Sequence, residues 1–506
     1  MNTAPRVAII GAGQGGLVSA NEVKKRVPDA EIVDFEVRNN VGGVWNLGDT
    51  PKNYEIRFDD FGQAHAATSF SHYSEGVVDV KEEVPPSAIY GSLRTNLPTE
   101  LMSFRNDEHL ESTHRFPSHT EILKYLERFA KKYGLTKLIQ LGTRVLRLKH
   151  ADGVAKYKCG YLPQQKGRWE ITLENVNTKQ QAIEWYDFVI NASGHYVQAH
   201  IPFIDNLWKF EGDLFHSRFY ESAEQFRGKS CVVIGSRASG YDISREIAWL
   251  DRSPEHGQSP YNSVKENPGL PSTRIIQSRR SPPKYEWKEE RPRWLDKIEQ
   301  RGEVVGTHGR SVIYADGHVD HGIDVIIFGT GYTYTYPFMR PTDEPWKSNS
   351  VFPQSNQSRK NVLDDIPAHL RLPYNLPDSA QGSMTLVNLS KHNLFYLSDP
   401  SYAFVGLLRH VHPFALSEAQ AHVIAFVLSL KERMIPSVLL QESYEADQFW
   451  TFPTEFEMTD EMLLAINEGK DYHIEKENVW SWYRTPEWVL KLAESASKDK
   501  RLLLGY

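Results

Sequence analysis

Three glycines near the start of the chain have the spacing of a phosphate-binding turn. Gly11, Gly13 and Gly16 follow the apolar segment Val7–Ile10 in the pattern G-x-G-x-x-G. In such a turn the first glycine permits the tight bend, the second lets the backbone approach a pyrophosphate, and the third lets helix and strand pack closely. The pyrophosphate is bound by the N–H groups and dipole of the helix N-terminus. The spacing predicts a dinucleotide site, the alternative being a glycine-rich turn without a ligand.

An acidic residue narrows the choice of dinucleotide at this turn. Glu36 ends the next apolar segment, Ile32–Phe35, and lies 20 residues after Gly16. A carboxylate at this position can accept a hydrogen bond from a ribose 2′-hydroxyl. FAD and NAD carry that free hydroxyl, whereas NADP carries a phosphate there. The first turn is therefore expected to bind FAD or NAD.

A second glycine turn occurs later in the chain. Gly235 and Gly240 follow the apolar segment Val232–Ile234, and Arg237 stands where the middle glycine of the pattern belongs. The Arg237 guanidinium either pairs with a pyrophosphate directly or turns away and leaves the backbone contact intact. The remaining candidates for cofactor binding in this turn are Ser236 and Ser239. The turn predicts a second dinucleotide site.

The strand expected after the second turn ends in basic residues. Arg274–Gln277 is followed by Ser278 and Arg279, with no acid at the place that Glu36 holds in the first unit. A hydroxyl and a guanidinium suit a ribose 2′-phosphate. This strand end therefore favours NADPH at the second site, the alternative being a solvated basic face.

Strand–turn–helix units must position both candidate sites. The pattern predicts helices from about Gly15 to Arg26 and from the second turn to about Leu250. Such units imply parallel sheets with crossover helices, and hence an α/β fold with two Rossmann-like dinucleotide-binding domains. Two stretches rich in proline and polar residues, at about 251–272 and 340–379, are expected to be loops.

Composition and charge exclude several classes of protein. A net charge of -7 over 506 residues, without a basic stripe, argues against nucleic-acid binding. Cys159 and Cys231 are the only cysteines, which excludes a disulfide framework, and no metal cluster or catalytic Ser-His-Asp set emerges. No uncharged apolar stretch reaches the roughly eighteen residues of a membrane span. We expect a soluble protein of the reducing cytoplasm, with no metal site.

The most specific pattern lies between the two glycine turns. Phe210–Tyr220 reads F-x-G-x-x-x-H-x-x-x-Y and resembles the fingerprint of class B flavoprotein monooxygenases. The tyrosine at the last position, Tyr220, resembles the version of the fingerprint found in flavin-containing monooxygenases, whereas Baeyer–Villiger enzymes usually have tryptophan there. The chain as a whole resembles the soluble fungal or bacterial type of these monooxygenases, without a membrane anchor. Further segments resemble the family in the same order: Val41–Trp45, Tyr90–Pro98, Ala192–His195, Phe328–Tyr332 and Pro413–Ala421.

The resemblance implies how the two domains share the chain. An FAD-binding domain would comprise residues 1–200 and 325–450, and an NADPH-binding domain of residues 201–324 would be inserted into it. Residues 451–506 would form a C-terminal helical extension. The family also implies a homodimer as one quaternary arrangement.

The resemblance further implies a reaction and residues that serve it. NADPH reduces FAD, O₂ adds at flavin C4a, and the resulting hydroperoxide oxygenates a nitrogen or sulfur nucleophile of a small molecule. Asn96 is the implied catalytic residue, whose amide donates to the peroxide or holds NADP⁺. His216 is interpreted as a residue that positions the two domains. The other implied cofactor contacts are Gly43, Trp45, Thr95, Thr330, Gly331 and Tyr332.

Three alternatives to this reaction stay open from the sequence. The first is Baeyer–Villiger oxidation of a ketone by the same cofactors. The second is an NADPH-dependent flavin reductase, although the chain has no redox C-x-x-C motif. The third is a flavoprotein without catalytic activity.

Overall fold

The structure is a computed structural model of the full chain. It describes residues 4–48, 54–67, 73–74, 77–78, 84, 86–105, 107–155, 157, 160–163, 165–250, 272–280, 293–354, 359–373, 382–430, 434–442, 448–450, 452–467 and 484–504. Cys159 and most of the predicted loop at 251–272 lie outside these residues. Within them, no helix combines the length and the apolar character needed to cross a membrane.

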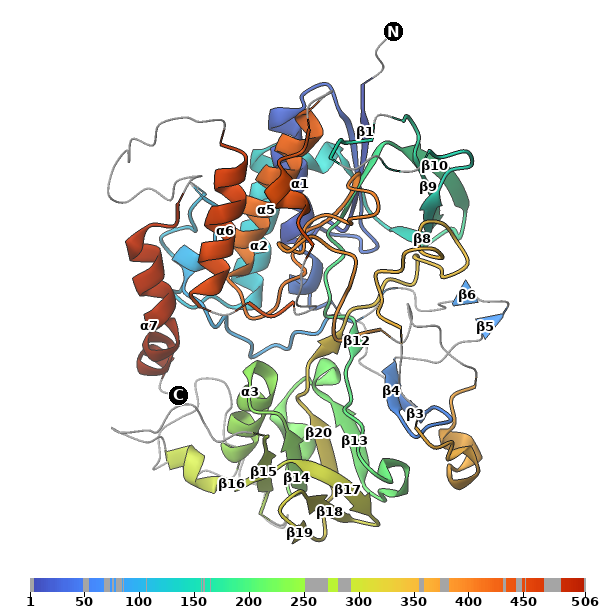
Figure 1. Ribbon diagram of the computed structural model, residues 1–506. Coiled ribbons are helices and arrows are strands. Elements are labelled where there is room, and N and C mark those ends of the chain that lie inside the picture. The colour runs from blue at the N-terminus through green and yellow to red at the C-terminus, as the bar shows by residue number, and fades with distance from the viewer. Residues whose placement is uncertain are drawn as a thin grey trace.

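The first glycine turn belongs to a five-stranded sheet in the upper lobe of Figure 1. Its neighbouring strands pair in parallel, as expected for strand–helix–strand units. In spatial order the strands are β22 (Tyr402–Phe404), β11 (Phe188–Asn191), β1 (Arg6–Ile10), β2 (Glu31–Phe35) and β7 (Ile139–Gln140). Strands β1 and β11 are buried along nearly their whole length, which is typical of a sheet covered on both faces.

The second glycine turn belongs to a separate five-stranded parallel sheet, in the lower lobe of Figure 1. Its strands, in spatial order, are β13 (Asp213–His216), β20 (Val325–Phe328), β14 (Ser230–Ile234), β15 (Arg274–Ser278) and β16 (Ile298–Arg301). All five lie between β11 and β22 along the chain, so the second lobe is inserted into the first. β20 belongs to this sheet, although the predicted boundary of the second domain falls just before it at residue 324.

The two passages of the chain between the lobes are paired with each other. β12 (Gln198–Ala199) enters the second lobe and β21 (Tyr332–Thr333) leaves it, and the two form an antiparallel pair. The second core also takes side chains from outside the insert, among them Phe58, Tyr90 and Ile366. Phe58 belongs to the hairpin of β3 (Glu55–Phe58) and β4 (Ala64–Ala67). The lobes thus share packing as well as a double connection.

Smaller sheets flank the two lobes. β8 (Thr143–His150), β9 (Trp169–Asn175) and β10 (Gln181–Tyr186) form an antiparallel sheet beside the first. β17 (Val304–His308), β18 (Ser311–Tyr314) and β19 (Val319–Asp320) form another in the second lobe. A short hairpin joins β5 (Tyr73–Ser74) and β6 (Val77–Val78).

Helices cover the first sheet and carry the chain to its end. α1 (Gln14–Arg26) follows the first turn as predicted and packs on α5 (Pro413–Ser429), next to α2 (His119–Lys132). α3 (Ala238–Ala248) follows the second turn. α6 (Thr454–Ala465) packs on α5, and α7 (Glu487–Leu504) runs down the outside of the first lobe toward α3 (Figure 1).

Candidate active site

The first turn is shaped so that a side chain cannot occupy it. Gly11 has φ +103°, and a Cβ there would lie 2.8 Å from the Ala192 carbonyl oxygen. A Cβ on Gly16 would lie 1.8 Å from the Gly11 carbonyl oxygen. Gly43 approaches Gly13 so closely that a Cβ on Gly43 would be 3.0 Å from the Gly13 Cα. The two glycine segments thus leave bare backbone facing bare backbone, as close approach of a pyrophosphate requires.

The N-terminus of α1 is available to an anion. Gly13 is its N-cap and provides no side-chain hydrogen bond, and the first turn of the helix contains no acid. Its N–H groups and dipole therefore favour a phosphate. Together with the bare glycines, this end fits the pyrophosphate of FAD.

Glu36 lies beside the same turn and is held rigidly. Its carboxylate accepts the backbone N–H groups of Ala12 and Arg38, both at 2.9 Å. Burial raises the pKa of Glu36, and the hydrogen bonds from Arg38 and Ala12 oppose that rise. The carboxylate is therefore fixed against the turn at the end of β2.

The second turn repeats the geometry of the first. Gly235 has φ +110°, and a Cβ there would lie 2.4 Å from the Gly329 carbonyl oxygen. A Cβ on Gly240 would lie 2.3 Å from the Gly235 carbonyl oxygen. Gly329 is a glycine for a local reason, because its own Cβ would meet the Gly240 Cα at 2.7 Å. This contact explains why position 329 is a glycine in this chain.

Arg237 caps α3 and reaches across to the first lobe. Its side chain is exposed, and its Nη1 lies 3.0 Å from Nε2 of His410. Burial and the nearby positive charges of Arg237 and Arg409 together lower the pKa of His410 to about 4. His410 is therefore a neutral acceptor at neutral pH. Its partner Arg237 lies at the helix N-terminus where a pyrophosphate would bind, with Ser236 before it and Ser239 in the first turn of α3.

At the basic end of β15, Ser278 is buried whereas Arg279 is partly accessible. Ser278 is buried, and its hydroxyl donates to the Gly302 carbonyl at 2.8 Å. The Ser278 carbonyl accepts the N–H of Gly235 at 3.0 Å, so this residue supports the turn. Arg279 is half-buried at the strand end and bonds the Gln300 side chain. Arg279 is thus the more accessible of the two toward a 2′-phosphate.

The fingerprint histidine bonds the backbone through both ring nitrogens. His216 is fully buried, with Nδ1 accepting the N–H of Arg218 and Nε2 lying 3.0 Å from the Gly331 carbonyl. Burial lowers the pKa of His216 to about 3. A neutral imidazole held in this way fixes Gly331 next to the passage between the lobes, which supports the positioning interpretation.

The last fingerprint residue and Tyr90–Pro98, the active-site segment that contains Asn96, both bond to α3. The Tyr220 hydroxyl donates to Glu246 on α3 at 2.5 Å, and the Ser92 hydroxyl donates to the same carboxylate at 2.7 Å. The Tyr90 hydroxyl donates to Asp242, also on α3, at 2.7 Å. A tryptophan at position 220 has no hydroxyl, so it could not make the hydroxyl bond to Glu246 that Tyr220 makes. Sequence reasoning missed Glu246 and Asp242, because nothing near them in the chain marks them.

The remaining predicted residues lie around these turns. Asn96 is exposed, and its Oδ1 accepts a hydrogen bond from Lys500 at 2.7 Å. Thr95 is buried and its hydroxyl donates to the Leu97 carbonyl. Trp45 is half-buried against the first core, and Tyr332 is buried with its ring edge-on to His216. The Thr330 hydroxyl donates to the His200 carbonyl.

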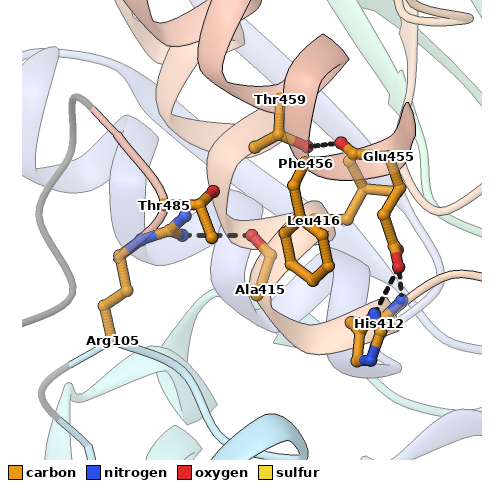
Figure 2. Close-up of a pocket in the computed structure, with 8 residues that line it drawn as sticks. All are labelled: Arg105, His412, Ala415, Leu416, Glu455, Phe456, Thr459 and Thr485. Atoms are coloured by element: carbon orange, nitrogen blue, oxygen red, sulfur yellow. Dashed lines mark hydrogen bonds and ion pairs between the residues drawn. The ribbon is translucent and has the colours of Figure 1, made fainter. Parts of the chain in front are cut away.

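A small pocket lies where the C-terminal helices join the first lobe (Figure 2). In it, Nδ1 of His412 lies 2.5 Å from Glu455 at the start of α6, and Arg105 donates to the Ala415 carbonyl at 3.0 Å. The other lining residues are Leu416, Phe456, Thr459 and Thr485. None of the predicted cofactor residues lines it, so its contacts serve to attach α6.

Comparisons with known proteins agree with this geometry. The profile of a family described as "Flavin-binding monooxygenase-like" matches residues 71–253 and 293–353. The flavin-containing monooxygenase FMO GS-OX-like 4 of Arabidopsis thaliana is 29% identical over 433 residues, which cover 84% of this chain and 76% of the relative. The thiol-specific monooxygenase of Saccharomyces cerevisiae is 28% identical over 437 residues, covering 84% and 78%.

The solved structures show the same fold. The S-allyl-L-cysteine S-oxygenase of Allium sativum aligns with 99% of this chain and 93% of its own, with a TM-score of 0.65 and 23% identity. The predicted α/β fold with two dinucleotide-binding domains is confirmed. The chain is similar in sequence and in fold to flavin-containing monooxygenases, and its cofactors are FAD and NADPH.

Proposed function

We propose that this flavin monooxygenase transfers one oxygen atom of O₂ to a sulfur or nitrogen atom of a small molecule, with sulfur as the preferred centre. The reaction consumes substrate, O₂, NADPH and a proton, and yields the oxygenated substrate, water and NADP⁺. FAD, when bound, supplies the electron transfer and oxygen activation. The relatives named for thiol and S-allyl-L-cysteine oxygenation support sulfur as the centre attacked.

One observation carries the proposal. The two glycine turns belong to one chain and are joined through a fingerprint whose Tyr220 shares the Glu246 carboxylate with Ser92. This contact connects the segment that contains Asn96 to the helix expected to bind the NADPH pyrophosphate. Hydrogen bonds to Glu246 therefore hold the expected NADPH site on α3 and the segment containing Asn96 in a fixed position relative to each other.

We assign the cofactor contacts from the geometry of the turns. Gly11, Gly13, Gly16 and Gly43 would admit the FAD pyrophosphate, and Glu36 its ribose. At the second turn, the NADPH pyrophosphate would meet the N-terminus of α3, where Arg237 stands, and Arg279 would face the 2′-phosphate. The other proposed contacts are Trp45, Thr95, Gly235, Ser236, Ser239, Gly240, Ser278, Thr330, Gly331 and Tyr332.

A product assay tests the reaction. Purified enzyme with FAD, NADPH and O₂ is offered a thioether, a tertiary amine and a cyclic ketone in separate reactions. We expect sulfoxide in the largest amount, N-oxide in a smaller amount, and equal molar consumption of NADPH and O₂. Conversion of the ketone alone would establish Baeyer–Villiger oxidation instead. NADPH oxidation without O₂ uptake would establish a reductase, and a flavin that NADPH never reduces would establish a non-catalytic flavoprotein.

A matched pair of variants tests the NADPH assignment. Arg279→Ala should raise KM for NADPH about tenfold while leaving KM for NADH unchanged, because one charge-assisted contact to the 2′-phosphate is lost. Arg57→Ala is the control, since Arg57 pairs with Glu55 on the surface hairpin. Equal effects of Arg279→Ala on both coenzymes would contradict the assignment.

We also propose a cytoplasmic location and a homodimer. The location is proposed from the presence of only two cysteines in 506 residues, and the homodimer from the family resemblance. Cell fractionation and light scattering of the purified protein would test the two statements separately.

A further inference from the structure

The C-terminal helix packs directly on the loop that contains Asn96. Val489 of α7 is fully buried in a small apolar cluster with Leu101 and Phe456, and Leu97 packs against this cluster. Further along the same helix, Asp499 pairs with Arg115 at 3.3 Å. α7 is therefore held along the side of the loop, and its last turns reach Asn96.

Lys500 makes the contact with Asn96. Its side chain is 7% exposed, and its Nζ donates to Asn96 Oδ1 at 2.7 Å and to the Arg94 carbonyl at 3.4 Å. An ammonium group can only donate, so the amide oxygen of Asn96 must face Lys500. The amide NH₂ of Asn96 is thereby turned away from Lys500 and is oriented to donate elsewhere.

The position of α7 is fixed by contacts at its start. Asp460 on α6 accepts both the N–H and the hydroxyl of Thr485 at 2.8 Å, just before α7 begins. α6 is itself attached to the start of α5 through Glu455 and His412, in the pocket of Figure 2. This chain of contacts holds the helix, and with it Lys500, in register with the loop.

We propose that Lys500 is a positioning residue that orients the Asn96 amide for oxygen transfer. The inference rests on the proposed function and on the role that the family resemblance implies for Asn96, whose amide would donate to the peroxide or hold NADP⁺. Without Lys500, the amide could rotate and present its oxygen instead of its NH₂ group. NADPH would still reduce the flavin, but more of the activated oxygen would be lost as hydrogen peroxide.

The charges around Lys500 predict a pH dependence. Burial, together with the nearby Arg245 and Arg94, lowers the pKa of Lys500 to about 8, although Asp242 on α3 opposes the shift. The ammonium form, which only donates, therefore dominates below pH 8. Above that pH the neutral amine can also accept a hydrogen bond, and the orientation of Asn96 is no longer enforced.

The first experiment measures hydrogen peroxide released per NADPH oxidised, in holoenzyme with a thioether substrate. Lys500→Met should release about tenfold more peroxide than wild type, the change expected from losing one charge-assisted hydrogen bond, with an unchanged rate of flavin reduction. Lys500→Arg keeps a permanent donor and should restore coupling. Lys498→Met is the matched control, because Lys498 is exposed on the same helix. Wild-type coupling in Lys500→Met would overturn the proposal.

The pH profile separates positioning from a structural defect. Peroxide release by wild type should rise as the pH passes about 8, whereas Lys500→Met and Lys500→Arg should show no such transition. An identical transition in all three proteins would overturn the role of Lys500.

The last experiment is independent of catalysis. Competitive acetylation read by mass spectrometry gives the titration midpoint of Lys500 in wild type and in Asn96→Asp. A carboxylate at position 96 should move that midpoint upward, and an unchanged midpoint would overturn the contact. If wild type itself forms no oxygenated product, the proposed function fails together with the catalytic role of Lys500. Failure of the present proposal alone leaves wild type active and Lys500→Met indistinguishable from it.

Discussion

Single carboxylates connect parts of this molecule that are far apart in sequence. Glu246 binds the hydroxyls of Tyr220 and Ser92, and thereby joins the fingerprint, the active-site segment and α3. Burial raises the pKa of Glu246, and the hydrogen bonds from Tyr220 and Ser92 oppose that rise. The tyrosine at the end of the fingerprint therefore has a physical role here, because its hydroxyl helps to keep a buried carboxylate satisfied.

Removing the Tyr220 hydroxyl should destabilise the folded protein. Tyr220→Phe should lower the free energy of unfolding by about 1–3 kcal/mol, since a buried carboxylate loses one of its donors. Urea denaturation followed by fluorescence measures the change. Tyr161→Phe serves as the control because Tyr161 is 47% exposed. Equal stability of the two variants would show that Tyr220 contributes nothing through its hydroxyl.

The carboxylate of Asp320 predicts how the free energy of unfolding depends on pH in acidic solution. Asp320 on β19 accepts hydrogen bonds from Arg274 at 2.7 Å and from Arg301 at 2.8 Å. Burial alone would raise its pKa, but the two arginines outweigh burial and lower the pKa from 3.8 to about 2. Its stabilising contribution is therefore complete above pH 3.8 and is lost as the pH falls through about 2.

Asp320→Asn should remove this part of the acid dependence. Between pH 4 and 2 the wild type should lose more unfolding free energy than the variant, measured by denaturant titration at each pH. Asp152→Asn, at an exposed position, should keep the wild-type slope. Parallel curves for wild type and Asp320→Asn would contradict the interpretation.

At the scale of elements, close approach of backbones determines where helices can lie. α3 begins against β20 with so little space that Gly329 cannot carry a side chain without meeting Gly240. An alanine at position 329 would therefore place its Cβ against the backbone of α3.

Introducing that alanine should displace α3. Gly329→Ala should weaken NADP⁺ binding about tenfold or more, because the helix N-terminus is pushed off the pyrophosphate position. Isothermal titration of NADP⁺ into the FAD-loaded enzyme measures the effect. Gly306→Ala is the control, since a Cβ there would meet its nearest neighbour at an ordinary 3.5 Å. Unchanged NADP⁺ affinity in Gly329→Ala would contradict the argument.

The elements that the sequence predicted best are those defined by local spacing. The helix predicted from about Gly15 to Arg26 is α1, which runs from Gln14 to Arg26, and both turns have the predicted backbone geometry. The contact between Lys500 and Asn96 spans 404 positions, so no local pattern could reveal it. Ser278 shows a similar limit, because its place in the sequence does not reveal that its hydroxyl also donates to the Gly302 carbonyl.

At the scale of the whole molecule, the insert and the first lobe share one core. Phe58, Tyr90 and Ile366 pack in the core of the second lobe although they lie outside the inserted segment. Buried apolar surface of this kind makes the unfolding of two lobes cooperative. The lobes are distinct in topology but not independent in stability.

A fragment of residues 201–330 should therefore fold poorly alone. It lacks the shared side chains, so we expect dye binding to exposed apolar surface and a broad thermal transition, compared with a sharp one for the full chain. Circular dichroism and calorimetry measure both. A sharp transition in the fragment would show that the lobe is autonomous.

The paired passages β12 and β21 have a consequence for building chimeras between relatives. Paired strands lie about 4.8 Å apart, so the entry and exit of the inserted lobe are adjacent and offer natural junctions for recombination. An exchange at these junctions alone would place foreign side chains against Phe58 of the β3–β4 hairpin. A chimera that keeps its packing must carry that hairpin along with the lobe, as a second, separate graft.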